Sequence, residues 1–119
     1  MGLKLNISEY EASKILWEWL TWKQLDKFCF HVSNEGRRSL HTGARLKAIG
    51  LRAGVSDYFI GLPRGRFHGC FLELKVGKNK LTKAQYEFFE HMATQDYYCA
   101  WATGFDEAKQ TIETYLAMK

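Results

Sequence analysis

The chain has 119 residues, enough for one hydrophobic core and too few for two, so we expect a single domain over residues 1–119. Hydrophobic residues make up 46% and charged residues 25%, with 4 Trp, 6 Tyr and 8 Phe, and this composition excludes an intrinsically disordered chain. No apolar run approaches the roughly 20 residues that span a bilayer, and the N-terminus lacks the layout of a signal peptide, so we expect a cytoplasmic protein with no membrane partner.

The positive charge of the chain is concentrated in one segment. Residues 36–72 hold seven of the 17 basic residues and one of the 13 acids, so this segment carries +6 and the remainder −2. The basic residues are Arg37, Arg38, Arg45, Lys47, Arg52, Arg64 and Arg66. Lys and Arg that neutralise phosphates release condensed counterions, so the segment favours a polyanionic partner. The alternative is an ordinary solvated loop face.

The first half of the chain predicts a helix, a strand and a short helix. The helix begins after Ser8, a natural N-cap with Glu11 at the capping-box position. Its apolar face holds Ala12, Ile15, Leu16, Trp19 and Leu20. A strand over residues 28–32, a polar turn over 33–36 and a short helix over 44–49 follow, and Gly50 can end that helix.

The second half predicts a hairpin, a helix, a strand and a helix. Strands over residues 58–62 and 67–76 are joined by a turn at 63–66. Thr82 caps a helix to Met92 with Tyr86, Phe88 and Phe89 facing inward. A strand over 97–102 and a helix from Asp106 follow. That helix carries Ala108, Ile112, Tyr115 and Leu116. The order α-β-α-β-β-α-β-α implies an α/β fold with a small mixed sheet flanked by helices.

The strand over residues 67–76 carries charges on one face. Alternation places Phe67, Gly69, Phe71, Glu73 and Lys75 on one side, and His68, Cys70, Leu72, Leu74 and Val76 on the other, core side. Asp57 opens the neighbouring strand. Two carboxylates on adjacent strands form a hard oxygen site suited to Mg²⁺ or Mn²⁺. A nearby lysine can orient water or stabilise charge on phosphorus, although a Glu–Lys pair at a frayed strand end is an equal alternative.

These residues resemble the split motif of the PD-(D/E)XK nucleases. Residues 54–57 read GVSD, with Ser56 where the motif has proline, and residues 71–75 read FLELK. Within that superfamily the chain is most similar to the virus-type replication-repair nuclease (VRR-NUC) domain. The likeness runs through residues 31–38 (HVSNEGRR), 46–57 (LKAIGLRAGVSD) and 81–85 (LTKAQ), and covers nearly the whole chain.

The resemblance implies a restriction-endonuclease-like core that hydrolyses DNA with Mg²⁺ or Mn²⁺. Asp57, Glu73 and the backbone carbonyl of Leu74 are then the expected ligands, with Lys75 at the attacking water. Family members add an acid from the first helix, here Glu9 or Glu11. Glu9 lies about 50° from the centre of the apolar stripe and Glu11 about 110°, which favours Glu9.

Family members also add a glutamine after the lysine, and the candidate here is Gln85. Its position has a second interpretation, because Thr82 and Gln85 are spaced as a capping box and one side chain does one task more easily than two.

The resemblance also implies the partners. The basic residues expected to contact phosphate are Arg37, Arg38, Arg45, Lys47 and Arg52, and such contacts position DNA without reading its sequence. Stand-alone members are dimers that cut branched DNA, including four-way (Holliday) junctions, in bacterial or phage-infected cells. Alternatives are a monomer that cuts flaps, or an inert nucleic-acid-binding module. Tyr10 or Trp17 would stack bases in that module, or Trp17 and Trp22 would line an interface.

The cysteines and histidines favour core packing over metal binding. Cys29, Cys70 and Cys99 are odd in number and sit in apolar runs, so we expect free thiols. A zinc module is the alternative, because Cys29 and His31 are close and His41, His68 and Cys70 follow. Their spacings do not repeat as zinc modules do.

Overall fold

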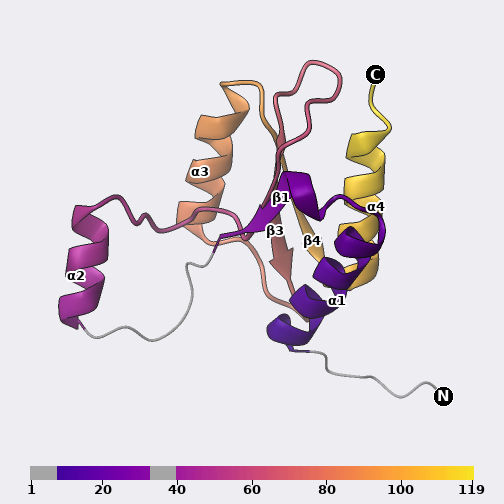
Figure 1. Ribbon diagram of the computed structural model, residues 1–119. Helices are drawn as coiled ribbons and strands as arrows, with labels where there is room; N and C mark the ends of the chain where they lie inside the picture. Colours follow the sequence, from indigo (N-terminus) through magenta and orange to yellow (C-terminus); the bar gives the residue numbers. More distant parts are fainter. Residues whose placement is uncertain (1–7, 33–39) are drawn as a thin grey trace.

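The computed structural model describes residues 8–32 and 40–119, and Figure 1 shows helices on both faces of a small sheet. Arg37, Arg38 and the predicted turn over residues 33–36 lie outside the described residues. The element order is the predicted one, with a 3-10 turn over Asp26–Phe28 added before the first strand. The predicted mixed α/β architecture is confirmed.

Helix α1 (Glu9–Trp22) begins with the predicted capping box. The Ser8 hydroxyl accepts from the Glu11 amide at 3.1 Å, and the Glu11 carboxylate accepts from the Ser8 amide at 3.3 Å. The buried stripe is Ala12, Leu16 and Leu20. It is narrower than predicted, because Ile15 lies at the edge of the stripe and stays exposed.

Four strands form one sheet in the order β1-β2-β3-β4. They are β1 (Cys29–His31), β2 (Tyr58–Ile60), β3 (Cys70–Lys75) and β4 (Tyr98–Thr103). Strand β2 runs antiparallel to both β1 and β3, and β3 and β4 are parallel. The predicted hairpin is therefore β2 and β3, and its two strands are shorter than the alternating patterns that predicted them.

Helices cover the two faces of the sheet unequally (Figure 1). Helices α1 and α4 (Gly104–Leu116) lie over one face, where Cys70, Leu72 and Leu74 join the core with Ile112 and Tyr115 of α4. Helix α3 (Lys83–Ala93) lies over the other face, where the ring of Phe88 meets that of Phe71 at 5.1 Å. The apolar core is thus on the side opposite Glu73, as alternation predicted for β3.

Three side chains depart from the predicted pattern. Alternation fails before Gly69: Phe67 packs on Tyr98 and Tyr115, whereas His68 is exposed beside Tyr97. The predictions for both are wrong because the ladder begins only at Cys70, so no pleat orients the residues before it. Tyr86, predicted to face inward, is 52% exposed because α3 turns Phe88 and Phe89 toward the sheet.

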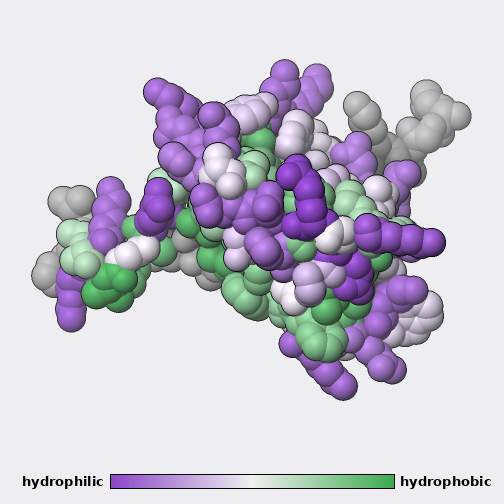
Figure 2. Space-filling view, turned by 90° about the horizontal axis from the view of Figure 1, so that it is seen from above, coloured by the Kyte–Doolittle hydropathy of each residue, from purple (hydrophilic) through white to green (hydrophobic). Residues whose placement is uncertain are grey.

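Helix α2 (Leu40–Ala48) stands away from the rest of the molecule (Figure 1). It begins earlier than predicted, and Gly50 follows it with a φ of +112°. Ile49 just beyond it is 82% exposed. Figure 2 shows this region as a separate lobe in which hydrophobic surface lies beside hydrophilic side chains. Arg45 and Lys47 in its last turn are therefore accessible to a large partner.

Candidate functional site

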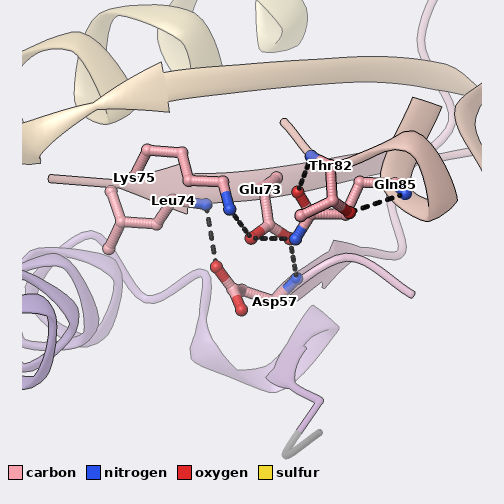
Figure 3. A network of polar contacts seen from close by, with 6 residues as sticks. All are labelled: Asp57, Glu73, Leu74, Lys75, Thr82 and Gln85. Carbon is pink, nitrogen blue, oxygen red and sulfur yellow. Dashed lines mark hydrogen bonds and ion pairs between the residues drawn. The ribbon is translucent and has the colours of Figure 1, made fainter. Parts of the chain in front are cut away.

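The pairing of β2 with β3 brings the two acids together. Tyr58 pairs with Leu72, so Asp57, one residue earlier, lies opposite Glu73 on the antiparallel strand. The Asp57 amide donates to Glu73 Oε1 at 3.2 Å, and the Leu74 amide donates to Asp57 Oδ2 at 2.9 Å (Figure 3). Asp57 and Glu73 are only 6% and 3% exposed. Two side chains that sequence reasoning placed near each other are thus in one buried network.

Burial and a like charge shape the electrostatics of this pair. Burial, followed by repulsion from Asp57, raises the pKa of Glu73 to about 8, while the Lys75 ammonium acts in the opposite direction. Lys75 Nζ lies 3.5 Å from Glu73 Oε2, and its side chain is 13% exposed. A buried carboxylate needs a partner charge or hydrogen bonds to stay ionised. One ammonium only partly offsets two acids, so the site has unmet demand for positive charge.

Gln85 makes both of the contacts that the sequence presented as alternatives. Its Nε2 donates to Glu73 Oε2 at 3.0 Å, and its Oε1 accepts from the Thr82 amide at 2.8 Å. The Gln85 amide in turn donates to the Thr82 hydroxyl at 3.2 Å, which completes the capping box of α3. One task is easier for a side chain than two, but the two ends of the Gln85 amide face different partners, so Gln85 closes the capping box and also contacts Glu73.

A pocket of about 340 Å³ opens beside the acids. It is lined by Lys47, Leu51, Arg52, Ala53, Gly54, Val55, Asp57, Glu73 and Gln85. Two of the predicted phosphate-binding residues, Lys47 and Arg52, therefore face the same pocket as Asp57 and Glu73. Arg45 lines a different, shallower pocket on α2 with Thr42, Leu46 and Ile49.

Gly54 allows the basic segment to reach the acids. Its φ is +91°, and a Cβ there would collide with the backbone carbonyl of Ala84 on α3. Only glycine combines this conformation with such a close approach. The chain between α2 and β2 is thereby held against the first turn of α3, beside Gln85. The sequence showed a glycine but not what it approaches.

The structure treats the two candidate acids of α1 differently. Glu11 caps the helix, as predicted. Glu9 is half-buried in the first turn. Within residues 8–32 and 40–119, no three Asp, Glu, His or Cys side chains are grouped as a metal site, so Glu9 does not complete a cluster with Asp57 and Glu73 in this conformation.

The cysteines are free thiols in or near the core. Burial, followed by the negative charge of Asp26, raises the pKa of Cys29 to about 11. Burial alone raises the pKa of Cys99 to about 11. Such thiols are poor metal ligands and nucleophiles at neutral pH, because it is the thiolate that reacts.

Sequence reasoning missed two features near the site. Ser56, in the position where the motif has proline, is fully buried, and its hydroxyl has no hydrogen-bond partner among the described residues. A groove of about 780 Å³ lies between α1 and β1, and Tyr10, Trp17, Phe30 and Tyr58 are among its lining residues. The exposed aromatics of α1 were the available signal for the groove, but its other wall comes from β1.

Comparisons with known proteins agree with this geometry. No protein-family model matches the chain, and no curated protein matches it. A solved structure described as a VRR_NUC domain protein superposes with a TM-score of 0.85 at 27% identity, over 98% of this chain and 93% of that one. Every helix among the described residues is too short or too polar to cross a bilayer. The chain therefore has the fold of a VRR-NUC domain, with a restriction-endonuclease-like core.

Proposed function

We propose that this domain is a metal-dependent DNA endonuclease whose active site is built on Asp57, Glu73 and Lys75. The observation that carries the proposal is the coincidence of two buried acids, one ammonium and two basic pocket residues at a single place. A structural salt bridge accounts for Lys75 and Glu73 but not for a second acid beside them. A phosphodiester that enters the pocket would meet the two acids and the two basic residues, with Lys75 beside Glu73.

The donor set fits a hard divalent cation. Asp57 and Glu73 offer carboxylate oxygens from adjacent strands, and the Leu74 carbonyl is a third candidate ligand. Burial, followed by repulsion from Asp57, raises the pKa of Glu73, so its carboxylate calls for compensating positive charge. Mg²⁺ or Mn²⁺ at these oxygens would supply that charge, polarise the phosphate and acidify a water. Glu9, half-buried in the first turn of α1, is the additional acid that we propose for this set.

Several residues of the chain have further roles in the proposed reaction. Lys75 lies on the Glu73 side of the site, where its ammonium can orient the attacking water or stabilise charge on the phosphate oxygens. Lys47 and Arg52 hold the phosphate backbone in the pocket, with Arg45 on α2 as a more distant contact. Arg37 and Arg38 extend this basic segment in sequence. Gln85 keeps Glu73 oriented from the α3 side.

The substrate we propose is branched DNA, and a four-way junction in particular. The contacts above address the backbone rather than base edges, which favours selection by shape. A homodimer with two sites related by a two-fold axis would suit paired cuts in a symmetric junction. A cytoplasmic role in a bacterium or phage-infected cell follows from the family resemblance. A monomer that cuts flaps is the competing form of the same activity.

The direct test is cleavage of labelled substrates. A four-way junction, a flap and a plain duplex are incubated with Mg²⁺, Mn²⁺ or EDTA, and light scattering gives the oligomeric state. Metal-dependent cutting confined to the junction by a dimer is expected. Cutting of flaps by a monomer would replace the junction assignment. Tight binding without cutting in any metal would overturn the nuclease proposal in favour of an inert DNA-binding module.

A second test addresses the phosphate contacts. The double variant Lys47→Glu/Arg52→Glu should weaken DNA binding and flatten its dependence on salt, because fewer counterions are released. Lys23→Glu, an exposed position at the end of α1, changes charge outside the pocket and serves as the control. Equal salt slopes for the two variants and the wild type would mean that Lys47 and Arg52 do not contact phosphate.

A further inference from the structure

The side-chain amide of Gln85 links the start of α3 to the acids of the sheet (Figure 3). The Thr82 backbone N–H donates to Gln85 Oε1 at 2.8 Å, and Gln85 Nε2 donates to Glu73 Oε2 at 3.0 Å. Glu73 Oε1 accepts from the Asp57 backbone amide at 3.2 Å. Thr82 itself is exposed and touches neither acid in this network. It therefore acts on them only through Gln85.

The capping box determines which way the Gln85 amide faces. A backbone N–H can only donate, so the Gln85 atom facing Thr82 is Oε1, and Nε2 is left to face Glu73. A flipped amide would present its oxygen to the carboxylate, and the two acceptors would repel. The cap removes that alternative.

The two capping boxes of this chain differ in a way that fits this role. At the start of α1 the third residue is Glu11, whose box lies on the surface. At the start of α3 the same position is Gln85. Either acid or amide satisfies a capping box, but only the amide has a donor to offer a carboxylate. The residue type thus follows from the second contact and not from the cap.

We propose that Thr82 is a positioning residue for the metal site, acting through the orientation of the Gln85 amide on Glu73. This inference rests on the proposed function, because it assumes that Glu73 binds a cation. Outer partners of metal ligands orient the ligand oxygens, and losing one weakens metal binding about 10- to 100-fold. Thr82 lies one step further out, so its loss belongs at the lower end of that range.

The test measures Mn²⁺ binding by calorimetry alongside DNA cleavage. Thr82→Val keeps the shape of the side chain and the backbone N–H, and it removes the hydroxyl that accepts from the Gln85 backbone amide. Losing this half of the capping box loosens the first turn of α3 and with it the contact between the Thr82 backbone N–H and Gln85 Oε1, so we expect about tenfold weaker Mn²⁺ binding. Thr82→Ser restores the hydroxyl and should restore the affinity. Ile112→Val is the control, because it destabilises the core of α4 to a similar degree without touching this network. A loss of affinity in both Thr82→Val and Ile112→Val would overturn the positioning role.

A double-mutant cycle isolates the route. If Thr82 acts through Gln85, then Thr82→Val should add nothing to the loss caused by Gln85→Ala. Additive losses would contradict the inference.

An NMR measurement gives a second test. The signal of the Gln85 side-chain amide should be slow to exchange in the wild type and fast in Thr82→Val. Failure of the wild type to bind Mn²⁺ would contradict the proposed function, whereas an unchanged amide signal in Thr82→Val would contradict the role of Thr82 alone.

Discussion

Neighbouring residues of β3 are buried on opposite faces of the strand and differ in chemistry. Leu72 and Leu74 point into the core between α1, α4 and the sheet and are fully buried. Glu73, between them, is 3% exposed on the other face, under α3. Burial of Leu72 or Leu74 stabilises the fold, whereas burial of the Glu73 carboxyl group on the same strand destabilises it. Depth of burial alone does not distinguish a core position from a site.

Phe71 on the Glu73 face packs against Phe88, but the two carboxylates beside it are held by hydrogen bonds and an ion pair. Glu73 accepts from Asp57 and Gln85 and pairs with Lys75, and Asp57 accepts from Leu74. These contacts lower the cost of burial, yet the pKa of Glu73 remains raised to about 8. Under the proposed function, the fold tolerates this face because a metal site requires buried carboxylates, and the predictions below test the contrast between the two faces.

The largest effect on stability is expected on the apolar face. Leu72→Ala removes a fully buried side chain and leaves a cavity, which lowers the free energy of unfolding by about 2–5 kcal/mol. Denaturant unfolding measures this loss. A loss below about 1 kcal/mol would mean that α1 and α4 are not packed on β3 as the structure describes.

The largest effect on activity is expected on the charged face. Lys75→Ala should reduce the cleavage rate by about 10²- to 10³-fold, the range for removal of one stabilising group in an active site. Its stability should fall by less than in Leu72→Ala, because the side chain lies on the Glu73 face of β3 and is not part of the apolar core. Single-turnover cleavage and denaturant unfolding measure the two quantities. A wild-type cleavage rate would remove Lys75 from the mechanism.

The raised pKa of Glu73 predicts how the metal-free protein responds to pH. The folded state keeps the Glu73 proton up to about pH 8, whereas the unfolded state loses it near the ordinary value of 4.5. The folded state therefore binds more protons between these values, and the stability contribution is lost as pH rises from about 4.5 to 8. Unfolding in EDTA across this range should show the decline.

Glu73→Gln is the matched variant for that prediction. It keeps the size of the side chain and removes its titration, so stability should depend less on pH between 4.5 and 8. Parallel pH profiles for the variant and the wild type would place the titrating group elsewhere.

The smallest effect is expected at Ser56. Its buried hydroxyl lacks a partner among the described residues, so Ser56→Ala should leave stability unchanged or raise it by up to about 1 kcal/mol. Thermal unfolding measures the change. A clear loss of stability would show that the hydroxyl is satisfied in solution, for example by a bound water, and that this polar group is held in the way that Glu73 is.

The sequence alone determined the element order and the central residues of the site. Apolar spacing located α1 and α4, and capping residues located the starts of α1 and α3, because helical periodicity and capping are local properties. Alternation placed Glu73 and Leu74 on opposite faces of β3 for the same reason. It failed at Phe67 and His68, where no ladder maintains the pleat.

Only the tertiary structure decided how those residues act on one another. The pairing of β2 with β3 set Asp57 against Glu73. The close approach at Gly54 brings Arg52, and Lys47 at the end of α2, to the pocket beside the acids, whereas Arg45 on the same helix lines a different pocket. Packing of α3 on the sheet let Gln85 serve the cap and Glu73 together. These outcomes depend on contacts between residues far apart in the chain, and local sequence patterns do not predict such contacts.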